Sequence, residues 1–314
     1  MIKHLLFTPI YQERVWGGTN LEDQLGRTLP AGKVIGESWD IVDRPEAQST
    51  TRTGQSLREL IQANPAGIMG AGWPASRPFP ILVKWLDCQQ KLSLQVHPPA
   101  EIAPALKGEP KTEIWYIADA APHATLIAGL KPGVTREDFE AGLKQGALEA
   151  LVHTLSVKAG ESILIPSGRI HAIGGGNLIL EIQQNSDTTY RVYDWGRVGL
   201  DGQPRQLHIE ESLQSTDFND FEPDTLKPDT TSEQLLAHSD VFDLRKLNLK
   251  AGESLNFDAG TPRILSVVTG ELSENDGSKL TRGDNALLPA SETFHYTATA
   301  DSEVLITENF AALA

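Results

Sequence analysis

The apolar segments of this chain are short, and residues that favour turns separate them. Segments with the length and composition of strands cover residues 81–86, 92–97, 114–118, 162–165, 178–183, 241–249 and 264–268. The 27 glycines and 19 prolines supply turns between such segments. Because many short strands with regular turns are typical of β-sandwiches and β-barrels, we expect a mainly β protein.

Two segments show helical spacing instead. In residues 135–152, apolar side chains recur at roughly helical intervals after Thr135, a suitable N-cap with Asp138 three residues later. A shorter helix is predicted at residues 57–63. We therefore expect a small helical insertion in the β structure.

The chain divides into two parts after residue 216. Residues 217–228 are acidic, contain two prolines and lack periodicity, as a linker would. The pentapeptide Lys-Ala-Gly-Glu-Ser occurs on both sides of this stretch, at residues 158–162 and 250–254. We predict a first domain at residues 1–216, a linker at 217–231 and a second β domain at 232–314.

The overall charge limits the partners. The formal net charge is −15, so the surface repels nucleic-acid phosphates and anionic lipids, and we expect no nucleic acid and no membrane as partner.

The single cysteine, Cys88, excludes an intrachain disulfide. No apolar run has the length of a signal peptide or a membrane span, so we expect a cytoplasmic protein. The oligomeric state stays open.

Two segments present polar side chains on one face of a predicted strand. Since alternate side chains of a strand point the same way, Ser93, Gln95 and His97 share a face. Lys111 and Glu113 share a face in a second segment. Alternation alone also fits a solvent-facing strand edge and a surface ion pair.

A third segment has a more specific pattern. Gly160, Pro166, Gly168 and His171 have the spacing of the second sequence motif of cupins. Gly160 turns the chain into a strand, and Pro166 with Gly168 forms a tight turn that aims His171 into the mouth of a barrel. His171 is therefore expected to bind a metal ion. The asparagine that usually ends the motif is replaced by Gly175.

Together these segments offer two imidazoles, one carboxylate and one amide oxygen, from His97, His171, Glu113 and Gln95. Imidazole and carboxylate ligands suit Zn²⁺. A single carboxylate leaves such a site with net positive charge and with room for water or substrate, as a catalytic site requires. Whether Gln95 binds the metal stays open.

The chain also resembles a known family. The segments SLQVHP (residues 93–98), KTEIWYI (111–117), IPSGRIHA (165–172) and LEIQQNSDTTYRVYDW (180–195) look like the four signature segments of type I mannose-6-phosphate isomerases, in the same order. Residues 9–18 and 36–39 fit the same family. The resemblance covers residues 7–210 well and the remainder loosely.

This resemblance implies a cupin jelly roll that binds one zinc ion and interconverts mannose 6-phosphate and fructose 6-phosphate. It places the metal ligands at His97, Glu113 and His171, with Gln95 as a fourth ligand. The catalytic arginine of the family falls on Arg191. Positions associated with the substrate phosphate are matched by Ser93 and Arg197.

The implied reaction is consistent with these residues. Aldose–ketose isomerisation removes a proton next to a carbonyl and passes through an enediol or enediolate, whose charge a metal and Arg191 would stabilise. The group that moves the proton stays open among Lys111, a metal-bound water and Glu181. We favour Lys111, since it would share a strand face with Glu113.

The second part of the chain repeats a turn, strand and proline pattern at residues 282–289. His295 follows without a second histidine nearby. We predict a degenerate jelly roll without metal that covers the apolar face of the first sheet.

Two functions from other classes remain as alternatives. Many cupins hold Fe²⁺ or Mn²⁺, so an oxidoreductase is one alternative. A non-catalytic sugar-phosphate-binding cupin is the other, because fold does not determine function. Arg191 and the phosphate-binding residues favour the isomerase, although its aldose phosphate could be another epimer.

Overall fold

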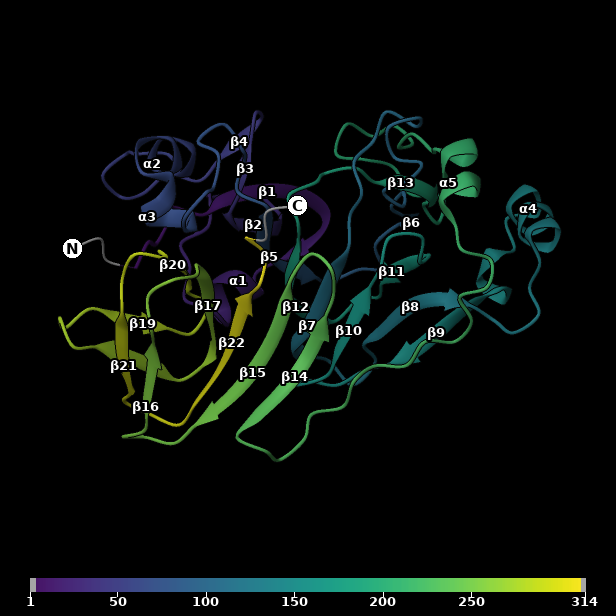
Figure 1. Cartoon of the computed structure of the whole chain (residues 1–314). Helices are drawn as coiled ribbons and strands as arrows, with labels where there is room; N and C mark the ends of the chain where they lie inside the picture. The colour runs from purple at the N-terminus through teal and green to yellow at the C-terminus, as the bar shows by residue number, and fades with distance from the viewer. Residues whose placement is uncertain (1–3, 312–314) are drawn as a thin grey trace.

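The computed structural model describes residues 4–311, and it confirms the prediction of a mainly β chain. The strands form two β-sandwiches, drawn mostly in purple to teal and in green to yellow in Figure 1. None of the helices in the described residues is long and apolar enough to cross a membrane.

The first sandwich consists of two antiparallel sheets. The six-stranded sheet has the order β1 (Ile10–Gly18), β2 (Ile35–Ile41), β5 (Ile81–Cys88), β12 (Asn177–Gln184), β7 (Glu113–Ala120) and β10 (Ser162–Ile165). The five-stranded sheet has the order β13 (Tyr190–Tyr193), β6 (Leu94–Val96), β11 (His171–Ile173), β8 (Thr125–Leu130) and β9 (Val152–Ser156). Apart from β1–β2 and β8–β9, neighbouring strands in these two sheets are not consecutive in the chain, as the crossing connections of a jelly roll require.

The second sandwich is built in the same way from later strands. One sheet has the order β14 (Glu233–His238), β15 (Asp243–Leu249), β22 (Ser302–Glu308), β17 (Arg263–Thr269) and β20 (Asn285–Leu288). The other has the order β16 (Ser254–Phe257), β21 (Phe294–Ala298), β18 (Glu271–Glu274) and β19 (Lys279–Thr281). A cluster of apolar and aromatic side chains fills the space between these two sheets.

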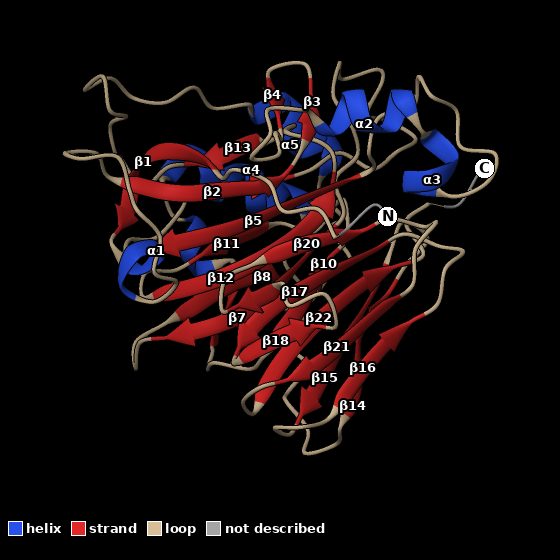
Figure 2. Ribbon diagram, turned by 90° about the vertical axis from the view of Figure 1, so that its left-hand side faces the viewer, coloured by secondary structure: helices blue, strands red, loops and turns tan. Residues whose placement is uncertain are grey.

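The two sandwiches pack against each other over an apolar interface. Trp85 of β5 and Leu180 of β12 belong to the same buried cluster as Leu244 of β15 and Leu305 of β22. Figure 1 shows the green and yellow strands of the second sandwich beside the teal strands of the first, and Figure 2 looks onto the faces of the stacked sheets, whose strands overlap in that view. The second sandwich thus covers the outer face of the six-stranded sheet, which would otherwise expose large apolar side chains to water.

A buried polar contact also joins the sandwiches. The Arg27 guanidinium donates to both carboxylate oxygens of Asp40, at 2.7 and 2.5 Å, and Asn285 of β20 donates to Asp40 at 2.7 Å. Arg27 also donates to the carbonyl of Gly283, so a charged pair from the first sandwich is completed by the second.

Short helices lie at the edges of the sheets. They are α1 (Asn20–Asp23), α2 (Leu57–Ala63), α3 (Pro65–Met69), α4 (Arg136–Gln145), a 3₁₀ turn η1 (Leu148–Ala150) and α5 (Ile209–Ser215). Helix α2 has the predicted bounds, and Thr135 caps α4 in a capping box with Asp138, as expected. The helix predicted over residues 135–152 is too long, because Gly146 ends α4 with φ of 67° and Val152 already belongs to β9.

The predicted linker lies against the first sandwich. Asp220 accepts two hydrogen bonds from Arg169, at 2.8 Å each. Leu226 exchanges backbone hydrogen bonds with Ser162 at the edge of β10. These contacts fix the point at which the chain leaves the first sandwich, close to the strands that carry the site described next. A small two-stranded sheet of β3 (Asp43–Arg44) and β4 (Ala47–Gln48) completes the fold.

Candidate metal centre and active site

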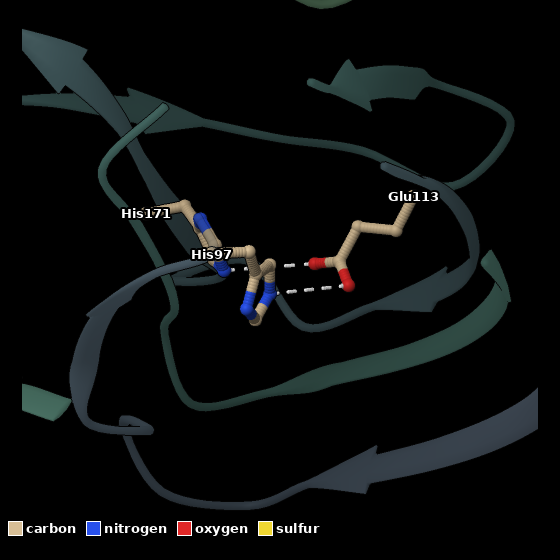
Figure 3. Close-up of side chains that lie close together, drawn as sticks. All are labelled: His97, Glu113 and His171. Carbon is tan, nitrogen blue, oxygen red and sulfur yellow. Dashed lines mark ion pairs between the residues drawn. The ribbon is translucent and has the colours of Figure 1, made fainter. Parts of the chain in front are cut away.

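Three buried side chains from different strands meet inside the first sandwich (Figure 3). His97 follows β6, Glu113 opens β7 and His171 opens β11, and each is at most 1% exposed. The Nε2 atoms of His97 and His171 lie 3.5 and 3.6 Å from the two carboxylate oxygens of Glu113. In the described residues this is the only group of three or more His, Cys, Asp and Glu side chains close enough to hold a metal ion.

The turn predicted from the cupin motif positions two of these residues. Gly168 has φ of 93°, a conformation that residues with a Cβ rarely adopt. Its amide donates to the carbonyl of His97 at 2.9 Å, which ties the end of β6 to the turn that leads into β11. The glycine therefore brings His97 and His171 to the same place.

The backbone sets the orientation of both imidazoles. The Nδ1 atom of His97 lies 2.8 Å from the carbonyl of Thr188, and Nδ1 of His171 lies 2.8 Å from the carbonyl of Arg169. A carbonyl can only accept, so Nδ1 carries the proton and Nε2 presents its lone pair to Glu113. Burial lowers the pKa of His97 to about 3 and also lowers the pKa of His171, so both rings are neutral.

The unpartnered atoms of this cluster fit a metal ion. Neither Nε2 atom has a hydrogen-bond partner among the described residues, and Oε1 of Glu113 has none either. Leaving buried polar atoms unsatisfied costs about 1–3 kcal/mol each, and a cation between them would remove this cost. Two neutral imidazoles and one carboxylate form a donor set that Zn²⁺ accepts.

A cavity of 590 Å³ opens beside the cluster. The predicted residues Ser93, Gln95, Lys111 and Arg191 all line this cavity. Lys111 lies between the cavity and the histidine–glutamate cluster, because it lines the cavity and its Nζ lies 2.6 Å from Oε2 of Glu113. The volume lies within the usual range for pockets that bind small molecules.

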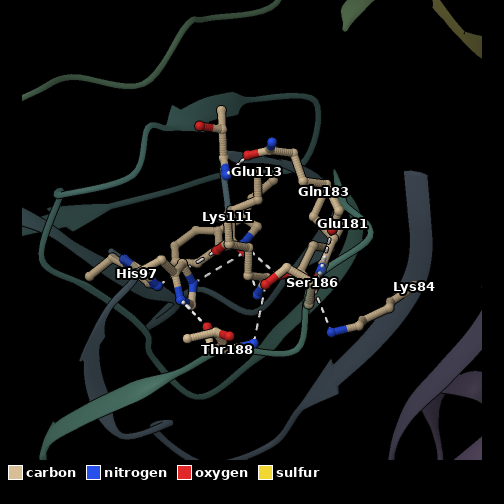
Figure 4. Close-up of polar contacts among 12 residues, drawn as sticks. Lys84, His97, Lys111, Glu113, Glu181, Gln183, Ser186 and Thr188 are labelled. Atoms are coloured by element: carbon tan, nitrogen blue, oxygen red, sulfur yellow. Dashed lines mark hydrogen bonds and ion pairs between the residues drawn. The ribbon is translucent and has the colours of Figure 1, made fainter. Parts of the chain in front are cut away.

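Two lysines and a glutamate, Lys84, Lys111 and Glu181, line the cavity, and Figure 4 shows their side chains close to Glu113. Glu181 accepts a hydrogen bond from Trp115 Nε1 at 3.0 Å, and its other carboxylate oxygen lies 3.4 Å from Lys84 Nζ. Burial would lower the pKa of Lys111, but the carboxylates of Glu113 and Glu181 outweigh it and raise this pKa. Burial and the charge of Glu113 raise the pKa of Glu181. Two groups with shifted pKa values and opposite charge therefore face the same space.

Arg191 enters the cavity from the five-stranded sheet. It lies opposite Gln95 in the pairing of β13 with β6. Its Nη1 donates to the carbonyl of Gln206 at 2.8 Å, but no ion pair joins it to a carboxylate of the described residues. Arg191 therefore forms no salt bridge with Asp187 or Asp194, although both lie in the same sequence segment.

Arg197 lies apart from the other predicted residues. It borders a separate, smaller hollow next to Lys91, Glu149 and Trp195. Its guanidinium is held by Asp194 at 2.7 Å and by the carbonyl of Lys91. The structure thus gathers seven of the eight predicted site residues and leaves Arg197 outside the cavity.

Several residues of the cavity were not predicted. They are Arg14, Glu37, Lys84, Asp187, Arg205 and His208, among others. Arg14 and Glu37 lie in the segments at residues 9–18 and 36–39 that resemble the family. This resemblance was the sequence signal that could have placed them at the site. Arg205 lies in an irregular loop, where no sequence pattern indicates which way a side chain points.

Comparisons with known proteins agree with this geometry. Residues 5–114 match the family described as phosphomannose isomerase type I, catalytic domain. The chain is 36% identical over 298 residues to mannose-6-phosphate isomerase ManA of Bacillus subtilis, covering 91% of this chain and 92% of that protein.

Solved structures show the same architecture. A crystal structure of mannose 6-phosphate isomerase from Bacillus subtilis superposes with a TM-score of 0.86 at 28% identity, covering 98% of this chain and 99% of that one. A mannose 6-phosphate isomerase bound with zinc and yttrium shares the fold with a TM-score of 0.75 at 18% identity, covering 98% of this chain and 100% of that one. The fold, the site geometry and the full-length relatives together place the chain in the family of type I mannose-6-phosphate isomerases.

Proposed function

We propose that the cavity catalyses a zinc-dependent interconversion of mannose 6-phosphate and fructose 6-phosphate through an enediol or enediolate. The single observation that carries this proposal is the buried His97–Glu113–His171 cluster, whose Nε2 atoms lack protein partners. It lies beside a cavity that Lys111 and Arg191 also reach. The family relationship supports the substrate pair.

The cluster would hold the metal with Gln95 as a fourth ligand. Gln95 lines the cavity and lies opposite both His171 and Arg191 in the five-stranded sheet. When bound, zinc would polarise the substrate oxygens and stabilise the negative charge that develops on them. The zinc in the solved relative of the same fold supports the choice of metal.

Arg191 would stabilise the same negative charge from the other side. An arginine keeps its proton at any working pH, so it offers a permanent positive charge. The Nη1 contact with Gln206 fixes the guanidinium before substrate arrives. Such preorganised charge costs no reorganisation during the reaction.

Lys111 would move the proton between the two substrate carbons. Its Nζ lines the cavity and touches Glu113, so a substrate at the cluster lies within its reach. Glu181 is the competing group, because its raised pKa suits a group that both accepts and donates a proton. The raised pKa of Lys111 keeps its amine protonated while Glu113 stays beside it, so Lys111 would act as a base only when a cation at the cluster offsets the charge of Glu113. Ser93 is buried, lines the cavity beside β6 and would orient the substrate.

The proposal can be tested by removing and restoring the metal. The purified protein is assayed for conversion of mannose 6-phosphate to fructose 6-phosphate before chelation, after chelation and after addition of zinc. Metal content is measured in the same samples. We expect activity to disappear with the metal and to return with zinc. Full activity in protein that elemental analysis shows to be free of metal would contradict the zinc dependence.

A further inference from the structure

A buried glutamine, Gln183, lies beside the metal cluster but does not line the cavity. It belongs to β12 and lies directly opposite Glu113 in the pairing of β12 with β7. Directly paired residues of antiparallel strands place their side chains next to each other on the same face. The amide of Gln183 and the carboxylate of Glu113 are therefore neighbours inside the first sandwich.

The amide nitrogen of Gln183 holds the turn that follows β12. Its Nε2 donates to the carbonyl of Gln184 at 2.8 Å and to the carbonyl of Ser186 at 2.6 Å. Because both carbonyls can only accept, the nitrogen end of the amide must face the turn. One side chain thus fixes the segment in which the chain leaves the six-stranded sheet for β13 of the five-stranded sheet.

The same segment carries the backbone group that orients His97. The amide of Thr188 donates to Oγ of Ser186 at 3.2 Å, and the carbonyl of Thr188 accepts from Nδ1 of His97 at 2.8 Å (Figure 4). A path of three contacts therefore leads from Gln183 through Ser186 and Thr188 to a residue of the metal cluster.

The two histidines of the cluster differ in where their support comes from. Nδ1 of His171 contacts the carbonyl of Arg169, two residues earlier, and the turn at Gly168 sets this local geometry. His97 depends on Thr188, which is 91 residues away and lies in a segment without regular secondary structure. Loops are in general more mobile than the strands they connect, so this carbonyl needs an additional restraint.

A second buried glutamine offers a comparison for this amide. Gln234 of β14 donates to the carbonyl of Lys227 at 2.8 Å and accepts from the amide of Asp229 at 3.4 Å, so both ends of its side chain have partners. The Oε1 atom of Gln183 has none among the described residues. Because an unsatisfied buried acceptor is unfavourable, a purely stabilising role explains Gln183 less well than an action on the turn.

We infer that Gln183 is a positioning residue that strengthens metal binding by holding the carbonyl that orients His97. This inference rests on the proposed function, because that function places a zinc ion at the cluster. A hydrogen bond to Nδ1 fixes the ring orientation and the tautomer of a ligating histidine, and losing such a partner typically weakens metal binding by about 10- to 100-fold. Gln183 acts on this partner indirectly, so its effect should lie at the lower end of the range.

The test compares Gln183→Met with Gln234→Met in the second sandwich. Methionine has a similar length but no hydrogen-bond donor, so both variants lose a buried amide. The proteins are stripped of metal, and their zinc affinity is measured by competition with a chromophoric chelator. Urea unfolding of the metal-free proteins measures the stability that each variant loses. Absorption spectra after loading with Co²⁺ report the geometry of the ligands.

We expect Gln183→Met to weaken zinc binding by about tenfold and to change the Co²⁺ spectrum. Gln234→Met should lower the midpoint of urea unfolding but keep the zinc affinity within about twofold of the wild type and the spectrum unchanged. Gln183→Met that is fully loaded with zinc should retain most of the wild-type kcat, because Lys111 and Arg191 stay in place.

A second variant, Ser186→Ala, tests the path to His97. It removes the acceptor of the Thr188 amide and should also weaken zinc binding. If both side chains act through the Thr188 carbonyl, the fold-loss in the double variant is smaller than the product of the two single losses. Losses that multiply would contradict the inference. Should Gln183→Met not fold, Ser186→Ala decides alone, and an unchanged zinc affinity in that variant refutes the path.

Three results would overturn the inference. They are zinc binding by Gln183→Met as tight as in the wild type, an equal loss in Gln234→Met, and a wild type that binds no zinc. Failure of the proposed reaction looks different. A wild type that binds zinc, and loses affinity in Gln183→Met, but does not isomerise mannose 6-phosphate keeps the role of Gln183 and refutes the reaction.

Discussion

The two sandwiches begin comparable strands in the same way but fill their interiors differently. Lys-Ala-Gly-Glu-Ser precedes β10 in the first sandwich and β16 in the second, and its glycines, Gly160 and Gly252, have φ of 88° and 89°. Between the sheets of the first sandwich, the buried cluster of His97, Glu113 and His171 lies among apolar side chains. The core of the second sandwich is built from apolar side chains, with the hydroxyl of Tyr296 beside His4 as a polar contact.

A single histidine shows why the interiors differ. His295 lies on β21 between Phe294 and Tyr296, which both belong to the apolar core. Because side chains alternate along a strand, His295 faces solvent, where its Nδ1 lies 2.9 Å from the side chain of Asn256. The face of the strand on which a histidine lies therefore decides whether its side chain can reach a metal ion inside a sandwich of this fold.

The strongest test of this comparison replaces one histidine in each sandwich. His97→Ala should remove the metal and reduce kcat/KM by about 10³-fold or more, since a bound metal supplies several kcal/mol of transition-state stabilisation. His295→Ala should leave both properties within about twofold of the wild type, because its side chain lies on the surface. Metal analysis and the isomerase assay provide the two readouts. Full zinc occupancy in His97→Ala would refute the ligand set.

Replacing Arg191 separates the chemistry of the first sandwich from its metal site. Arg191→Ala should lower kcat by about 10²- to 10³-fold, the usual loss when a preorganised charge is removed. The zinc content should not change, because Arg191 does not contact the cluster in the described structure. Turnover close to that of the wild type would exclude Arg191 from the mechanism.

A third pair of variants tests the contact between the sandwiches. Asp40→Ala leaves the buried Arg27 guanidinium without its carboxylate, and the free energy of unfolding should fall by about 3–5 kcal/mol. Asn285→Ala removes only a neutral donor on the other side of the same contact and should cost about 1–2 kcal/mol. Urea unfolding of both variants measures the difference. Equal losses would show that the contact does not depend on the buried charge.

The smallest expected effect concerns the repeated turn. Alanine at either glycine must adopt a left-handed backbone conformation, which costs about 1–2 kcal/mol. A Cβ at Gly160 would also lie 3.3 Å from Pro228, whereas none of the described atoms lies within 4 Å of a Cβ at Gly252. Gly160→Ala should therefore lower the melting temperature more than Gly252→Ala. Equal losses would mean that Pro228 moves to make room for the Cβ, and the reverse order would refute this steric argument.

Local patterns predicted much of the fold. The strands at residues 162–165 and the helix at residues 57–63 have the predicted bounds, because flanking turn and capping residues mark their ends. The helix predicted at residues 135–152 extends too far, because Leu148 and Leu151 continue the apolar spacing past Gly146, which ends α4. Periodicity does not distinguish a continuing helix from a 3₁₀ turn that packs on the same core.

The site shows the same division between local and tertiary information. His171 was predicted from a turn motif whose geometry is local, and His97 and Glu113 from strand alternation together with family resemblance. The sequence analysis gave Arg14 and Arg205 no role. It matched Arg197 to a position that binds the substrate phosphate, but Arg197 lies outside the cavity. The places of these arginines depend on carboxylates far away in sequence or in a loop, and no periodicity encodes these partners.

The sequence by itself determined the strand pattern, the turn at Gly168 and the set of residue types that a metal-dependent isomerase needs. These properties depend on backbone preferences and side-chain chemistry, which act over a few residues. Only the tertiary structure decided that Arg205 enters the cavity, that Arg197 stays outside it and that His295 faces solvent. Those outcomes follow from packing and ion pairing between segments distant in the chain, and such contacts exist only in the folded protein.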